Sequence, residues 1–305
     1  MRKLLIHITA LLFIACASPS ESDSNTDGRL KIVCTTGMLG DAVKEIVGDQ
    51  AEVTYLMGPG VDPHLYKATQ GDLKLLTNAD VIIYNGLHLE GKMGEVFEKL
   101  ENRKQIIVAA DGIPKEKLIN STDFQGAYDP HLWFDVSLWE EVCNYLGKTL
   151  SKLEGVDKEM IRSQSYAYSD SLKALHQWVT KEMAKVADSQ RVLITAHDAF
   201  GYFGRAYDVE VKGLQGISTL SEYGLKDVSD LVNYISDRNI KAVFVESSVS
   251  DRSLNAVVQG CKEKGHQVHI GGTLFSDAMG EAKSAEGKYI GMVRYNVNTI
   301  VEALK

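Results

Sequence analysis

Two copies of one tripeptide place histidines where they could bind a metal ion. Asp-Pro-His occurs twice in a chain with only five prolines, and the copies end at His64 and His131. Proline fixes its own φ and favours an extended conformation for the residue before it, so each copy is a rigid turn that presents one imidazole. Rigid ligands favour metal binding, because little conformational entropy is then lost on binding. Chance repetition of the tripeptide is the alternative.

A third histidine stands at the end of a predicted strand in RVLITAHDAFGYF, residues 191–203. The strand-forming run 192–196 leads directly into His197, and Asp198 stands where a helix N-cap is expected. Ligand sites of open α/β sheets collect at the carboxyl ends of the strands. Taken alone, His197 is equally compatible with a role in local hydrogen bonding.

Asp277 lies in a loop of small residues that follows the last predicted strand. By itself it would be an ordinary loop or N-cap carboxylate. With the three histidines it would give three imidazoles and one carboxylate, a set that suits zinc, manganese or ferrous iron better than calcium or magnesium. His88, which follows a strand end in NGLHLEG, is a weaker ligand candidate.

The pattern around these residues predicts an α/β protein with two similar parallel-sheet lobes. In the first half, apolar strand-like segments (30–36, 51–57, 80–85 and 105–110) alternate with helix-like ones, and the same alternation returns with strands at 191–196, 209–215, 241–246 and 266–272. Between them, 156–187 contains no Pro or Gly and has apolar residues at helical spacing, which predicts one long backbone helix joining the lobes. Two shorter helices broken near 169–171 are the alternative.

The N-terminus has the features of an export signal. Arg2 and Lys3 precede an apolar run that is too short to span a bilayer and that ends before Cys16. It resembles a bacterial lipoprotein signal, in which the first mature residue is a lipid-modified cysteine, although Phe13 stands where such signals usually carry Leu. A plain secretory peptide is the alternative. The expected organisation is a signal peptide (1–15), a flexible tether (16–28), an N-terminal lobe (29–155), a spine helix (156–187) and a C-terminal lobe (188–305).

Composition narrows the functional classes. The chain is 44% hydrophobic and 24% charged, which is ordinary for a globular protein and unlike a disordered or multi-span membrane protein. Its net charge of −8 becomes −10 without residues 1–15, since 31 basic residues then face 41 acidic ones. Such a charge disfavours nucleic acid as a partner and favours cations. Cys34, Cys143 and Cys261 show no C-x-x-C spacing, so neither a disulfide framework nor a thiolate zinc site is expected.

Six segments together resemble the TroA-like solute-binding proteins of ABC metal importers, the cluster A-I zinc and manganese receptors, also described as adhesin-like lipoproteins of a cell adhesion family. They are GVDPHLYKAT, DPHLWFD, TAHDAFGYF, LQGISTLSEYG, AVFVESSVS and GGTLFSDAMG, spread over residues 30–305. The resemblance implies two four-stranded lobes, one backbone helix and a metal buried between the lobes. It makes His64 and His131 the N-lobe ligands, His197 and Asp277 the C-lobe ligands, and Glu246 a candidate for holding a ligand imidazole from outside the shell.

Two departures bear on which metal is bound. Many zinc receptors of this family carry a His-rich loop, yet residues 111–128 contain no His. Many manganese-selective members have Glu at the third ligand position, which here is His197. The pattern of three imidazoles and Asp is associated with members that take both metals, and intrinsic affinity at a nitrogen-rich site favours Zn²⁺ over Mn²⁺. One divalent ion, Zn²⁺, Mn²⁺ or Fe²⁺, is the expected cargo.

The expected function is that of a binding protein and not an enzyme. The resemblance implies an extracytoplasmic receptor on the periplasmic side or the cell surface, monomeric and anchored through lipidated Cys16. It would deliver metal to an ABC permease and its ATPase, with no nucleic acid partner. A zinc-dependent hydrolase is an alternative, although H-E-x-x-H is absent. A receptor for an iron chelate on the same two-lobed architecture is a further alternative.

Overall fold

The computed structural model describes residues 28–121 and 126–305. The predicted signal peptide, Cys16 and all but the last residue of the predicted tether lie outside the described residues. Within the described part of the chain, no helix is long and apolar enough to cross a membrane.

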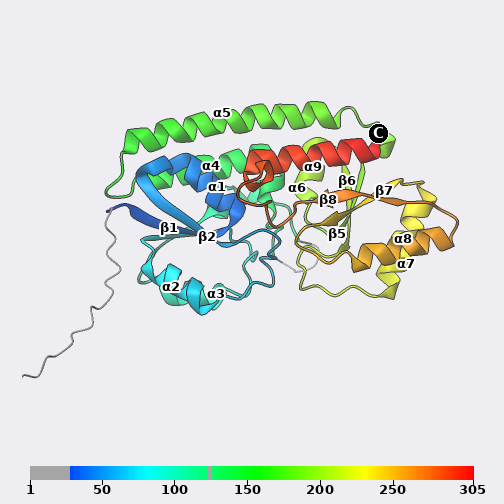
Figure 1. Cartoon of the computed structure of the whole chain (residues 1–305), viewed down its shortest axis with the longest axis horizontal. Coiled ribbons are helices and arrows are strands. Elements are labelled where there is room, and N and C mark those ends of the chain that lie inside the picture. Colours follow the sequence, from blue (N-terminus) through cyan, green and yellow to red (C-terminus); the bar gives the residue numbers. More distant parts are fainter. Residues whose placement is uncertain (1–27, 122–125) are drawn as a thin grey trace, which may run out of the picture.

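The first lobe is built on a four-stranded parallel sheet with the strand order β2-β1-β3-β4. Its strands are β1 (Leu30–Thr36), β2 (Ala51–Met57), β3 (Val81–Tyr84) and β4 (Gln105–Val108). Its helices are α1 (Gly37–Val47), α2 (Gln70–Asn78), α3 (Gly94–Leu100) and α4 (Val136–Leu150). Figure 1 shows α2 and α3 on one side of this sheet and α1 and α4 on the other.

The second lobe repeats this plan, with four parallel strands in the order β6-β5-β7-β8. Its strands are β5 (Val192–His197), β6 (Glu210–Gln215), β7 (Ala242–Glu246) and β8 (His269–Leu274). Its helices are α6 (Gly201–Tyr207), α7 (Leu225–Asp237), α8 (Arg252–Glu263) and α9 (Tyr289–Leu304). The fold class expected from the sequence, two parallel-sheet α/β lobes, is confirmed.

A single helix, α5 (Lys158–Met183), runs along both lobes (Figure 1). It begins at Asp157, whose carboxylate accepts hydrogen bonds from the amides of Glu159 and Met160. It packs against α1 and α4 of the first lobe and α6 and α9 of the second. The helix is unbroken, so the alternative of two shorter helices is wrong, and it is a few residues shorter than the segment 156–187.

The two lobes share one hydrophobic core. A single cluster of buried side chains runs from Ile32 in β1 to Leu304 at the end of α9. Aromatic contacts cross between the lobes, with ring centroids 4.1 Å apart for Phe134 and Phe200. Separating the lobes as rigid bodies would expose this apolar surface to water, which is costly. The core therefore holds the two sheets in a fixed relation.

Several candidate residues lie at or after the carboxyl ends of strands, where the lobes face each other. His197 ends β5, Glu246 ends β7, and Asp277 follows β8 by three residues. The expectation that Asp198 caps a helix is wrong, because α6 begins at Gly201 and Phe200 occupies its N-cap position. The amide of Asp198 instead donates to the carbonyl of Gln215, at 3.0 Å, and continues the pairing of β5 with β6.

The three cysteines of the described chain, Cys34, Cys143 and Cys261, are free and buried. Burial raises the pKa of each thiol, so these side chains are small hydrophobic groups of the core.

Candidate metal centre

The structure brings His64, His131, His197 and Asp277 together between the lobes. One potential ligand atom from each lies within 4.8 Å of every other, and all four side chains are buried. Nε2 of His64 is 3.4 Å from Nε2 of His131, and the three Nε2 atoms lie 3.3–3.5 Å from the oxygens of Asp277. Donors about 2.0–2.1 Å from an ion at the corners of a tetrahedron are about 3.3–3.4 Å apart. The spacing therefore fits one four-coordinate transition metal ion.

Each Asp-Pro-His turn is closed by its own aspartate. The amide of His64 donates to Oδ1 of Asp62 at 2.8 Å, and the amide of His131 donates to Oδ1 of Asp129 at 2.9 Å. An aspartate that accepts from the amide two residues later forms a compact turn, which proline between them stiffens. The repeated tripeptide thus gives the same local structure twice, as the sequence pattern predicts.

Two of the imidazoles are oriented by carboxylates outside the cluster. Nδ1 of His131 is 2.7 Å from Oδ1 of Asp129, and Nδ1 of His197 is 2.5 Å from Oε2 of Glu246. A carboxylate at Nδ1 fixes the tautomer, so that Nε2 is left free for a metal. This contact supports the orienting role expected for Glu246. The equivalent role of Asp129 was not predicted, although the repeated aspartate was the signal for it.

The loop that carries Asp277 is held by contacts from both lobes. The indole Nε1 of Trp133 donates to the carbonyl of Ser276 at 3.0 Å, and the hydroxyls of Ser248 and Ser276 are 3.0 Å apart. Both carboxylate oxygens of Asp277 and Nε2 of His197 are buried without a well-aligned hydrogen-bond donor or acceptor among the described residues, and the close contact between Nδ1 of His197 and Oε2 of Glu246 is an ion pair and not a well-aligned hydrogen bond. Buried polar atoms without partners are costly. A bound cation would satisfy all three atoms at once.

The cluster is polarised in a way that favours a cation. Burial by itself lowers the pKa of His131 and His197, but neighbouring carboxylates outweigh burial and raise the pKa of His131 to about 9 and that of His197 well above its usual range. Burial opposes ionisation of Asp277, yet His197 and His131 hold its pKa well below its usual range. Burial lowers the pKa of His64 to about 3, despite the attraction of Asp277. A divalent ion would replace a proton at His131 and at His197, whereas His64 is already neutral.

The sequence model of the ZnuA family, described as "Zinc-uptake complex component A periplasmic", matches residues 32–303. The chain belongs to the ZnuA family. The resemblance to TroA-like receptors expected from the six segments is confirmed.

Two named proteins resemble this chain over nearly its whole length. It is 50% identical to the manganese-binding lipoprotein MntA of Bacillus subtilis, over 95% of this chain and 94% of that protein. It is 45% identical to the zinc-binding protein TroA of Treponema pallidum, over 92% and 91% of the two chains. The solved structure of TroA superposes with a TM-score of 0.88, covering 91% of this chain and 99% of TroA. One relative is thus named for manganese and the other for zinc.

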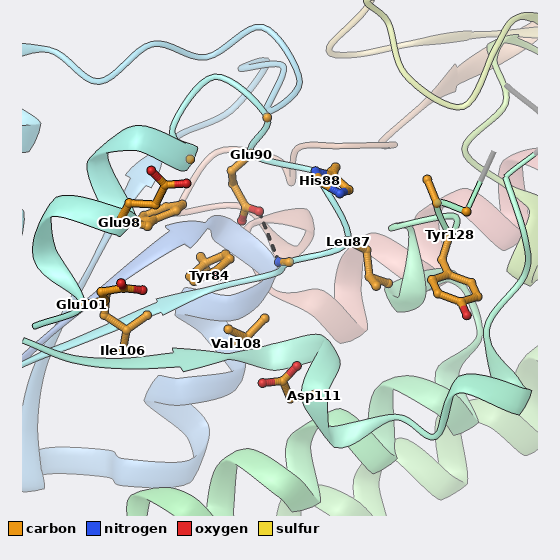
Figure 2. Close-up of a pocket in the computed structure, with 16 residues that line it drawn as sticks. Tyr84, Leu87, His88, Glu90, Glu98, Glu101, Ile106, Val108, Asp111 and Tyr128 are labelled. Carbon is orange, nitrogen blue, oxygen red and sulfur yellow. Dashed lines mark hydrogen bonds between the residues drawn. The ribbon is translucent and has the colours of Figure 1, made fainter. Parts of the chain in front are cut away.

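A cavity of about 770 Å³ lies away from the cluster, in the first lobe of this ZnuA-family chain (Figure 2). It is lined in part by Glu98, Glu101 and Asp111, and none of the four clustered residues borders it. His88 lies at its edge, exposed and in the left-handed region at φ 65°, and does not join the cluster. Its loop is held by the buried Glu90, which accepts a hydrogen bond from the Gly86 amide. The chemistry of the donor set, rather than cavity size, identifies the candidate centre.

Metal affinity is expected to fall as the pH falls. The pKa of His131 is raised to about 9 and that of His197 is raised well above its usual range, so both imidazoles carry a proton at neutral pH, and each must lose its Nε2 proton to bind metal. Each displaced proton weakens binding about tenfold per unit of falling pH, so displacement of two protons should raise the Zn²⁺ Kd by about ten-thousandfold from about pH 8 to about pH 6. Chelator-competition titrations across this range, with calorimetry in two buffers to count protons, provide the measurement. A Kd independent of pH would contradict these protonation states.

Replacing Glu246 by glutamine is expected to weaken metal binding by about 10- to 100-fold, because the amide is a poorer partner for Nδ1 of His197 and leaves the imidazole less basic. The measurement is the Zn²⁺ Kd by competition with a chromogenic chelator. Glu302→Gln, an exposed substitution on α9, is the matched control and should bind as the parent does. If Glu246→Gln also bound as the parent does, Glu246 would have no orienting role.

Proposed function

We propose that this chain is the extracytoplasmic substrate-binding component of an ABC importer for a divalent transition metal. In this proposal the four clustered residues, His64, His131, His197 and Asp277, bind one ion between the lobes, and the ion is the transported substrate. The observation that carries the proposal is the convergence of one donor atom from each residue within 4.8 Å, with four of the contacts at 3.3–3.5 Å, in a buried site whose carboxylate has no well-aligned hydrogen-bond partner among the described residues.

The named relatives support the same function. MntA of Bacillus subtilis is named as a manganese-binding lipoprotein, and PsaA of Streptococcus pneumoniae, 29% identical over 99% of this chain, as a manganese ABC transporter substrate-binding lipoprotein. By analogy, an ABC permease and its ATPase are the proposed partners. Anchoring through lipidated Cys16, on the periplasmic side or the cell surface, and a monomeric state are further parts of the proposal.

The donor set favours a receptor over a zinc hydrolase. Four donors complete a tetrahedral shell, whereas catalytic zinc sites keep one position for water. The close approach of the donors, all within 4.8 Å, also leaves room for a bare ion and not for an iron chelate. We therefore do not favour the hydrolase or the chelate receptor.

Three nitrogen donors and one oxygen donor bind Zn²⁺ more tightly than Mn²⁺ by intrinsic affinity. The cellular cargo also depends on which metal is available, so we propose Zn²⁺, Mn²⁺ or Fe²⁺ as the cargo class. Metal analysis of protein purified from metal-replete cells, followed by competition between Zn²⁺ and Mn²⁺, tests the proposal. One equivalent of metal per chain is expected. Protein that neither retains nor takes up one equivalent of any of these ions would contradict it.

A further inference from the structure

The two Asp-Pro-His turns differ in how the second oxygen of each aspartate is used. Asp129 bonds the ring of its own histidine, as described above. Asp62 instead reaches across to the second lobe, where the hydroxyl of Thr219 donates to its Oδ2 at 2.6 Å. Among the described residues, no carboxylate contacts Nδ1 of His64. The polar contacts of its ring are made by Nε2, with His131 and Asp277. His64 is therefore oriented mainly through its turn.

His64 also differs from the other three clustered residues because it borders a cavity. A cavity of about 390 Å³ opens between the lobes, and of the four clustered residues only His64 lines it. Leu87 and Pro130 border the cavity on the first lobe, and Ser218 and Leu220 border it on the second. The cavity thus gives access to the cluster from the side of His64.

Thr219 is fixed to the strand that pairs with the His197 strand. The side-chain amide of Gln215, at the end of β6, donates to the carbonyls of Thr219 and Ser221, both at 2.6 Å. Gln215 is paired in register with His197. The hydrogen bond from Thr219 to Asp62 therefore ties the His64 turn to the opposite side of the same cluster.

Local movement of the His64 turn costs less than separation of the lobes. Asp129 contacts the ring of His131, and its carbonyl accepts a hydrogen bond from the hydroxyl of Tyr202 at 2.9 Å. The loop of Asp277 is held by the indole of Trp133. The Tyr202 and Trp133 hydrogen bonds both connect one lobe to the other, and the lobes share one hydrophobic core. Opening at His64 breaks the Thr219 bond and leaves this core intact.

We propose that the metal ion enters and leaves beside His64, and that Thr219 is a positioning residue that acts through Asp62 to hold His64 in place and so governs the rate of metal release. The inference rests on the function proposed above. Thr219 does not touch the ion, and its effect is on the rate at which His64 withdraws.

Substitutions at Thr219 test the positioning role. Thr219→Val removes the hydroxyl at nearly constant volume, whereas Thr219→Ser retains it. Loss of a hydrogen bond to a carboxylate should speed dissociation of Co²⁺ into excess chelator by about tenfold or more in the valine variant, with parental rates in the serine variant. The Co²⁺ absorption spectrum, which reports coordination, should be unchanged. Should Thr219→Val fold poorly, Thr219→Ala tests the same loss. Parental dissociation without the hydroxyl would overturn the role of Thr219.

A bulky residue in the cavity tests the route. Leu220 lines the cavity and is 44% exposed, whereas Leu225, 91% exposed and close in sequence, does not line it. Leu220→Trp should slow Zn²⁺ association and dissociation by the same factor and leave Kd unchanged, because it obstructs the path without changing either end state. Leu225→Trp should match the parent. Parental rates in Leu220→Trp would overturn the route, whereas failure of the parent to bind one equivalent would contradict the proposed function instead.

Discussion

Replacing His197 with alanine is expected to abolish tight metal binding. His197 supplies one of four donors, and its Nε2 is 3.3 Å from Asp277. Loss of an outer partner of a ligand already costs about 10- to 100-fold in affinity, so loss of the ligand itself should cost more than about a hundredfold. The substitution also leaves Glu246 and Asp277 buried with one fewer cationic neighbour. The measurement is the Zn²⁺ and Mn²⁺ Kd by chelator competition.

The matched control is His269→Ala, which removes an exposed histidine from β8 in the same lobe. It should bind metal as the parent does. Thermal unfolding of both metal-free variants shows whether each is folded, so that a loss of affinity in His197→Ala can be assigned to the site. A folded His197→Ala variant with parental affinity would show that His197 is not a ligand.

A shift of preference toward manganese is expected when His197 becomes glutamate and Glu246 becomes glutamine in the same chain. An oxygen donor suits Mn²⁺ better than an imidazole does. The single change His197→Glu would set a new carboxylate against the buried Glu246, which now lies 2.5 Å from the imidazole. Two unpaired carboxylates in a buried site repel each other, and one would bind a proton instead of the metal. The double variant removes this conflict.

The ratio of the Zn²⁺ and Mn²⁺ dissociation constants is the quantity to compare. The Zn²⁺ Kd divided by the Mn²⁺ Kd should rise by about tenfold or more in the double variant, since each tenfold step corresponds to about 1.4 kcal/mol of differential binding. Glu246→Gln alone serves as the control, because it should weaken both metals without changing their ranking. An unchanged ratio in the double variant would show that residue 197 does not determine selectivity.

The strands and the long helix follow from the local pattern of apolar residues in the sequence. Buried parallel strands give apolar runs such as VLITA, and the long helix gives a segment with neither Pro nor Gly, so both were predicted. The ends of elements were less predictable. Asp198 has the composition of an N-cap, but its amide continues the pairing of β5 with β6, and α6 begins three residues later. Tertiary pairing outweighed local capping preference at this position.

Rigid turns and a strand end mark the three histidines in the sequence, whereas Asp277 stands out only in combination with them and through the resemblance to TroA-like receptors. The supporting contacts of these residues could not be predicted, since these depend on which segments meet in space. Thr219 is 157 residues from Asp62, and the indole of Trp133 reaches a carbonyl 143 residues away. No periodicity or motif encodes such pairs. Asp129 is the exception, because its position two residues before His131 allows it to contact the ring.

X-ray absorption at the zinc edge, on protein loaded with one equivalent of Zn²⁺, tests the central claim most directly. The account predicts four nitrogen and oxygen donors at about 2.0–2.1 Å with the scattering pattern of three imidazoles, and loss of one imidazole in His197→Ala. Sulfur at about 2.3 Å, or a shell with fewer than three imidazoles in the parent, would contradict the assignment of His64, His131, His197 and Asp277 as the metal ligands.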